Sequence, residues 1–379
     1  MAQLLPAFAE RYDVELKPHI VSPPPDWAAP DRARLDAYAR KDAARLAERA
    51  HLTYSDPSRQ PSPDQIQAAN QALVEAVDRG TFLDEAYAIG QQVWGNPDAL
   101  MTDAINTQIQ SQLEAATARR DALGHYLGGT VYYAGEWYWG PDRLHYLERR
   151  LADLGASRAD VGVFLFPPHS VDMAALETAN SEDLELHWYL SFRSPYTGIV
   201  ADRIKKIADM YGAELKLRYV LPMVMRGMQV PRKKGFYIMK DTVREAERQG
   251  ISFGNSVDPV GAPVERGYAI LHEAIKHGKG YDFARSFLAG VWSQGLDAGS
   301  DRGLKTITER AGLPWTEMKP LIGRDHWQAT ADANREEMFE YGIWGVPSFR
   351  VGDVTAWGQD RLWVIEDALA AQTEQIGEE

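Results

Sequence analysis

The sequence predicts an α/β protein in which one domain type occurs twice. Segment 41–49 reappears as 240–248 at an offset of 199 residues, and segment 139–144 reappears as 357–362 at an offset of 218. In the second copy, strand-like and helix-like patterns alternate, which is typical of α/β domains. Because there are only two long copies, the repeat indicates a tandem duplication rather than a solenoid.

Element order in the second copy follows from hydrophobic patterning and from helix-breaking residues. The expected elements are a strand at 184–192, a helix at 194–211, a strand at 215–220, a helical stretch at about 234–326, a hairpin of strands at 347–351 and 354–357, and a helix from near 360. Ser194 suits the cap of the first helix, Pro195 its first turn, and Gly212 its end. This is the order of a thioredoxin fold with a helical insertion, which we expect at about 225–335.

The first copy, over 1–155, is degenerate where this fold does chemistry. It begins inside the first helix, so the first strand and the loop after it are missing, and Gly128-Gly129-Thr130 replaces Gly345-Val346-Pro347. We expect a linker over 156–182 and the complete domain over 183–379. The apolar run 161–166 either supplies the missing strand, which would make the first domain a circular permutant, or is a linker strand.

Composition excludes several classes of function. The chain has no cysteine, so disulfide scaffolds, cysteine-ligated metals, a cysteine nucleophile and protein-borne dithiol exchange are ruled out. A net charge of −13 argues against general binding to nucleic acid or anionic membranes. The longest apolar run is too short to span a bilayer, and residues 1–10 do not read as a signal peptide, so a cytoplasmic protein is expected. The nine histidines lack metal-helix spacing, so no metal is expected, and the basic run 232–234 reads as a solvated loop on charge alone.

Three positions in the second copy could bind a ligand. Ser194 lies at a strand-to-helix junction, where its hydroxyl either caps the helix or donates to a bound thiolate or carboxylate. Val346-Pro347 begins a hairpin strand, where outward backbone groups either pair with an extended peptide or form an ordinary turn. Gln359 and Asp360 precede the last helix and could receive an amino group, although Asp360 also suits a helix cap.

Taken together, these segments resemble a known family. Residues 184–370 resemble the kappa-class glutathione transferases and the 2-hydroxychromene-2-carboxylate isomerases, within the DsbA-like thioredoxin superfamily. The matching segments are Ser194-Pro195-Tyr196, Lys234-Gly235-Phe236-Tyr237 leading to Asp241, Gly345-Val346-Pro347-Ser348-Phe349, and Trp357-Gly358-Gln359-Asp360-Arg361-Leu362. The first copy resembles the same family more weakly, over about 3–153, so two DsbA/kappa-type domains are expected.

The resemblance implies a glutathione-dependent isomerase or transferase acting on a hydrophobic, aromatic acid. Ser194 would hydrogen-bond the sulfur of glutathione, so a chain without cysteine would use a borrowed thiol. The thiolate would add to a conjugated double bond, and rotation and elimination would follow. The other implied residues are Val346, Pro347, Gln359, Asp360 and Lys234 for glutathione, and Tyr196, Met223 and Trp357 for a possible substrate pocket.

Two other functions compete with this interpretation. A thioredoxin-fold module could bind peptides or a partner protein without catalysis, and the degenerate first copy fits such a role. A disulfide oxidoreductase fits the superfamily but lacks the redox thiol. Members of the resembled family tend to be homodimers, so we expect either a homodimer or a monomer whose duplicate mimics the dimer.

Overall fold

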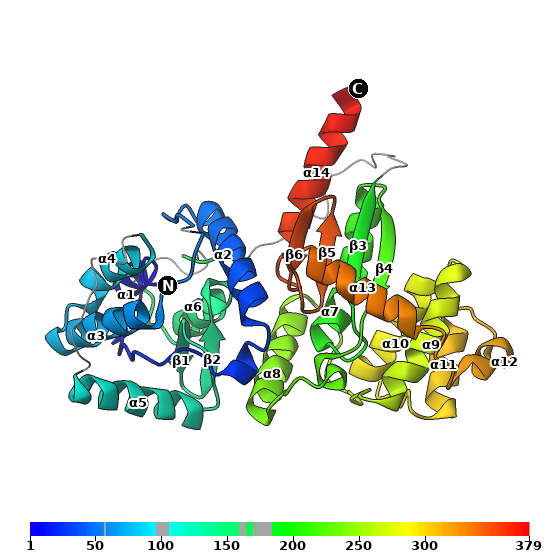
Figure 1. Ribbon diagram of the computed structural model, residues 1–379, viewed down its shortest axis with the longest axis horizontal. Helices are drawn as coiled ribbons and strands as arrows, with labels where there is room; N and C mark the ends of the chain where they lie inside the picture. Colours follow the sequence, from blue (N-terminus) through cyan, green and yellow to red (C-terminus); the bar gives the residue numbers. More distant parts are fainter. Residues whose placement is uncertain (57, 96–105, 159–163, 169–170, 172–183, 379) are drawn as a thin grey trace. The chain divides into compact units, whose positions relative to one another are not determined.

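The computed structural model describes residues 1–56, 58–95, 106–158, 164–168, 171 and 184–378. The chain divides into two compact units, Met1–His169 and Ser170–Glu379, called unit 1 and unit 2 below (Figure 1). Among the described residues, no helix is long and apolar enough to cross a membrane. The same residues contain no group of three or more acidic or histidine side chains placed to hold a metal ion.

Unit 2 contains a mixed sheet with the strand order β4-β3-β5-β6. Strand β3 (Glu185–Leu190) is parallel to β4 (Glu214–Tyr219) and antiparallel to β5 (Ser348–Val351), which forms a hairpin with β6 (Val354–Trp357). Because β3 lies between two strands and is covered on both faces, all its residues except the first are buried. The predicted strands and hairpin are confirmed, with ends shifted by one or two residues.

Helices surround this sheet, and those between β4 and β5 form the insertion. They are α7 (Pro195–Met210), α8 (Arg232–Arg248), α9 (Ala262–Lys276), α10 (Gly280–Ser293), α11 (Asp301–Arg310), α12 (Trp315–Met318), α13 (Gln328–Glu340) and α14 (Leu362–Glu378), with short 3₁₀ turns η4 (Met223–Arg226) and η5 (Lys319–Leu321). The predicted helical stretch is therefore several helices, and α9 to α12 gather beside the sheet (Figure 1). Residues 185–370 have the DsbA-like thioredoxin fold that the sequence predicts.

Aromatic packing joins the sheet of unit 2 to its helical insertion. Phe192, just after β3, stacks on Phe287 of α10 with ring centroids 3.9 Å apart, and its ring lies 5.0 Å from that of Tyr268 on α9. Gly267 makes this contact possible, because a Cβ there would lie 2.9 Å from the Phe192 ring. The end of β3 is thus held rigidly against the insertion.

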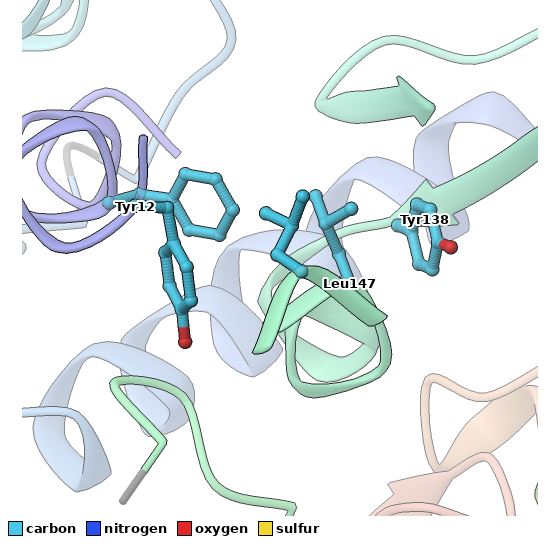
Figure 2. Packing of buried hydrophobic residues seen from close by; sticks show 5 residues of the cluster. Tyr12, Tyr138 and Leu147 are labelled. Atoms are coloured by element: carbon cyan, nitrogen blue, oxygen red, sulfur yellow. The ribbon is translucent and has the colours of Figure 1, made fainter. Parts of the chain in front are cut away.

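Unit 1 is mostly helical within its described residues. Its elements are α1 (Leu5–Arg11), η1 (Asp26–Ala28), α2 (Arg32–Arg49), α3 (Pro63–Arg79), α4 (Phe82–Gly95), α5 (Thr107–Ala122), β1 (Thr130–Tyr133), β2 (Glu136–Trp139), η3 (Pro141–Arg143) and α6 (Leu144–Asp153). The two strands form an antiparallel hairpin. A buried cluster that includes Tyr12, Tyr138 and Leu147 packs α1, β2 and α6 together (Figure 2).

The predicted strand over 161–166 is wrong for its described part. Residues 161–163 lie outside the described residues, and Phe164, Leu165 and Phe166 form no strand. The amides of Leu165 and Phe166 instead donate to the buried Glu148 carboxylate at 2.7 and 3.0 Å, and both side chains pack on the cluster of Figure 2. A carboxylate has taken the amide hydrogens that a strand ladder would need.

Element bounds in the two units agree with the offsets of the sequence repeat. Helix α4 and helix α10 coincide when shifted by 198 residues, and the hairpins β1-β2 and β5-β6 coincide when shifted by 218. Helices α11 and α12 occupy the interval in which the offset grows. The duplication hypothesis requires this agreement. Duplication itself remains a hypothesis, because the described residues of unit 1 form only a two-stranded sheet, whereas unit 2 has four strands.

Candidate active site

Three loops of unit 2 meet at one edge of the sheet. Because β3 and β4 are parallel, the loops that follow them leave at the same edge. Strand β5 is antiparallel to β3, so the residues that precede β5 lie at that edge too. Ser194 after β3, η4 after β4 and Val346-Pro347 before β5 therefore share the edge where open α/β sheets bind ligands.

Ser194 is the N-cap of α7 and also contacts the loop before β5. Its Oγ accepts a hydrogen bond from the Thr197 amide at 3.2 Å and donates one to the Val346 carbonyl at 3.3 Å. The peptide bond between Val346 and Pro347 is cis. The structure thus brings together Ser194, Val346 and Pro347, with Ser194 and Val346 both partly exposed.

The electrostatics at Ser194 favour an anion. The start of α7, a helix of 16 residues, presents backbone amides and the positive end of the helix dipole. A hydroxyl beside these amides can donate to a thiolate or a carboxylate. Because both effects stabilise the charged form of a thiol, this position would lower the pKa of a bound thiol.

Lys234 lies in the first turn of α8, and the prediction of a solvated loop over 232–234 is wrong. Pro231 precedes the helix, whose first residue is Arg232, so the basic run is helical. Burial lowers the pKa of Lys234. Within the described part of the chain, no hydrogen bond or ion pair engages its ammonium group. A desolvated cation without a partner suits a ligand carboxylate.

Gln359 lies in a buried polar network. Its amide oxygen accepts from Arg203 Nη2 at 2.5 Å and from Gln249 Nε2 at 3.2 Å, and its amide nitrogen donates to Glu245 at 2.9 Å. These bonds tie the loop before α14 to α7 and α8. The side chain predicted to contact a ligand is therefore engaged by the protein itself.

Asp360, the neighbour of Gln359, is more accessible. Its side chain is 25% exposed, and its Oδ1 lies 3.6 Å from Arg361 Nη1. Burial lowers the pKa of Arg203 to about 10, whereas the negative charges of Glu245 and Asp360 oppose that shift. Of the pair predicted to hold a γ-glutamyl end, Asp360 has the carboxylate that a ligand ammonium can approach.

The predicted pocket residues serve different roles. The Tyr196 hydroxyl donates to the buried Asp241 carboxylate at 2.7 Å, and Arg244 donates to the same carboxylate at 2.6 Å. This links α7 to α8. Trp357 packs edge-on against Trp344, with ring centroids 5.3 Å apart. Met223 begins η4 and is partly buried.

Sequence reasoning missed two sets of residues near this edge. The charged row Asp241, Arg244, Glu245 and Arg248 follows helical spacing on α8, so that spacing was a usable signal. The second set is Arg226 alone, a cation within the otherwise apolar turn η4, and its isolation there was the signal. Neither was recognised as near the site.

A separate cleft of about 560 Å³ lies between α7, α10 and the end of α11. Gly198, Phe253 and Trp292 are among its lining residues. None of the residues predicted from the sequence to bind a ligand lines it. The cleft is therefore distinct from the edge of the sheet at which Ser194 lies.

Comparison with known proteins finds a family model that matches unit 2 and relatives that match about half of the chain. Residues 185–370 match the family model described as a DSBA-like thioredoxin domain. The chain is 22% identical over 192 residues to a 2-hydroxychromene-2-carboxylate isomerase of Pseudomonas putida, covering 48% of this chain and 92% of the relative. It is 21% identical over 196 residues to the enzyme of the same name from Sphingobium xenophagum, covering 48% and 97%.

Solved structures with similar folds also cover about half of the chain. A 2-hydroxychromene-2-carboxylate isomerase structure superposes with a TM-score of 0.44 and 20% identity, covering 51% of this chain and 98% of the other. The cytosolic disulfide reductase DsbM from Pseudomonas aeruginosa with GSH gives a TM-score of 0.39 and 18% identity, covering 51% and 99%.

Proposed function

Residues 185–370 form a DsbA-like thioredoxin domain with low-identity relatives named as isomerases, and from this premise we propose a glutathione-dependent isomerase or transferase. Its second substrate is a hydrophobic, aromatic acid. The observation that supports the proposal most is the contact of Ser194 Oγ with the Val346 carbonyl at the start of α7. The chain itself has no cysteine, so the thiol comes from the cosubstrate.

Hydrogen bonds at this site exchange when glutathione binds. Ser194 Oγ turns from the Val346 carbonyl to the sulfur, and the carbonyl then accepts the amide hydrogen of the cysteinyl residue. The hydroxyl and the helix terminus stabilise thiolate over thiol, which lowers the thiol pKa. Lys234 pairs with a carboxylate of the tripeptide, and Asp360 with its ammonium group.

The chemistry that follows is addition and elimination. The thiolate adds to a conjugated carbon–carbon double bond of the acid, and the electrons move onto the conjugated carbonyl. The former double bond is then single and rotates. Elimination restores the double bond in the other geometry and releases the thiolate, so nothing is oxidised or reduced. If the attacked carbon carries a leaving group, the carbon–sulfur bond forms, the leaving group departs with the electron pair of its bond, and the thioether that remains is the transferase product.

Calorimetric titration with glutathione tests the proposal. The unmodified protein is expected to bind reduced glutathione, and Ser194→Ala and Asp360→Ala to bind it about tenfold more weakly, the scale of a lost hydrogen bond to a charged group. Ultraviolet absorbance of the thiolate provides a second readout, since the thiol should ionise at lower pH on the unmodified protein. No binding at millimolar glutathione would leave a non-catalytic thioredoxin-fold module as the better account.

Oligomeric state is a separate part of the proposal. A chain with two compact units could take the place of the homodimer expected from the family resemblance. Light scattering on the full chain separates the two cases. A monomer would support a single chain whose two units mimic the dimer, and a stable dimer would support the ordinary homodimer.

A further inference from the structure

Arg226, at the end of η4, is a partly buried arginine to which no described residue supplies a counterion. Its Nε and Nη1 atoms are buried and have no hydrogen-bond partner within the described residues. Burial lowers the pKa of Arg226 to about 10. Guanidinium nitrogens that have lost water without gaining protein partners destabilise the fold, so a ligand anion is the natural compensation.

Other partly buried arginines of unit 2 differ from Arg226 in this respect. Each of three retains an unbonded Nε, yet each also has an Nη group that donates to a protein oxygen. They are Arg203 with Gln359, Arg244 with Asp241, and Arg266 with Asp301. The neighbouring charge at Arg226 is instead the cation of Arg335, which disfavours the charged guanidinium.

Arg226 belongs to the same edge of the sheet as Ser194. Tyr268 connects the two loops, because its hydroxyl donates to the Val220 carbonyl at 2.6 Å and its ring lies 5.0 Å from that of Phe192. Phe192 is two residues before Ser194, and Tyr268 also feels the charge of Arg226. The guanidinium therefore lies beside the loops that form the candidate site.

Apolar, adaptable residues flank Arg226 in the sequence. Met223, Met225 and Met228 come from the same turn and the residues after it, and each is partly buried. Methionine side chains are flexible and polarisable, so they adjust to flat or irregular apolar ligands. A guanidinium in such a wall binds planar carboxylates through two parallel hydrogen bonds.

We propose that Arg226 is the specificity-determining residue that binds the carboxylate of the aromatic acid, while the methionines of the turn contact its apolar body. This inference rests on the proposed function, in that the acid is the second substrate of the Ser194 site. The charged ends of glutathione go elsewhere, to Lys234 and Asp360. The turn after β4 thereby selects acids over neutral analogues of the same shape.

The test compares trans-cinnamate with its neutral amide, each titrated by calorimetry with and without glutathione. The unmodified protein should bind the acid at least tenfold more tightly than the amide, and Arg226→Gln should lose that preference through weaker binding of the acid alone. Arg226→Lys should retain a reduced preference. Arg335→Gln is the matched control, since it removes a neighbouring cation that the protein pairs with Asp332 and Glu336.

Stability and glutathione binding separate the possible outcomes. Because no described residue pairs with the charge of Arg226, Arg226→Gln should unfold at no lower urea concentration than the unmodified protein; marked destabilisation would indicate a structural role and overturn the inference. An unchanged preference for the acid in Arg226→Gln, or an equal loss in Arg335→Gln, would also overturn it. If glutathione fails to bind while the preference persists and depends on Arg226, the proposed function fails and the assignment of Arg226 stands.

Discussion

Replacing Ser194 with alanine should reduce stability and ligand binding by two separable routes. The substitution removes the helix cap on the Thr197 amide and the hydrogen bond to the Val346 carbonyl. A lost serine cap costs about 1 kcal/mol, and a second neutral hydrogen bond up to about 1 kcal/mol. The free energy of unfolding should therefore fall by about 1–2 kcal/mol.

Ser300 provides a matched control in the same unit. It caps α11, where its Oγ accepts from the Gly303 amide at 3.0 Å and donates to the Asp297 carbonyl at 2.8 Å. These bonds repeat those of Ser194 at slightly shorter distances, and both serines are partly exposed. Ser300→Ala should therefore lose at least as much stability, although its helix lies within the insertion rather than at the sheet edge.

Urea unfolding followed by tryptophan fluorescence measures the first effect, and calorimetric titration with glutathione measures the second. Both variants should lose stability, and only Ser194→Ala should lose glutathione affinity. Equal loss of affinity in both variants would show that general destabilisation, not the Ser194 hydroxyl, weakens binding. Unchanged stability in Ser194→Ala alone would mean that its two hydrogen bonds contribute nothing to the fold.

Three further predictions concern other parts of the molecule. Gly303→Ala would place a Cβ 2.1 Å from a backbone carbonyl oxygen, so the free energy of unfolding measured in urea should fall by about 3 kcal/mol. A smaller fall than that of Ser300→Ala would contradict this packing. Burial and the neighbouring Arg350 guanidinium lower the pKa of His187 below its ordinary value of 6.5. The unfolded chain then takes up a proton that the native state resists, so the free energy of unfolding should fall as pH drops below 6.5, and the fall should be shallower in His187→Gln. Equal slopes for the two proteins would refute that origin. Glu148→Leu in unit 1 removes a buried carboxylate that accepts three hydrogen bonds, so the free energy of unfolding should fall by about 3 kcal/mol. Hydrogen exchange should also become faster at the amides of Leu165 and Phe166, which donate to this carboxylate. Unchanged exchange would exclude that anchoring role.

Much of unit 2 could be predicted from the sequence because its elements follow local rules. The strand of Glu185–Leu190 is a strand-like, partly alternating run, and Ser194-Pro195 opens a helix by cap chemistry that involves residues three apart. The hairpin at Gly352-Asp353 follows from its turn residues. The same rules failed for 164–166, where a distant carboxylate competes with strand pairing.

Residue roles at the site depended on partners far away in the chain. Charge alone predicted that 232–234 is a solvated loop, whereas packing makes it helical and desolvates Lys234. Sequence position alone placed Gln359 near a ligand, whereas Arg203, 156 residues earlier, engages its side chain.

By itself, the sequence determined most of the strands and helices of unit 2, that a serine caps the helix after the first strand, and that the chain has no thiol of its own to react. Only the tertiary structure decided that Ser194 contacts Val346, 152 residues away, and that two guanidinium nitrogens of Arg226 are buried with no partner among the described residues. The physical reason is one of range. Caps and hydrophobic periodicity act over a few residues, whereas burial, hydrogen-bond competition and charge pairing depend on whatever the folded chain brings alongside.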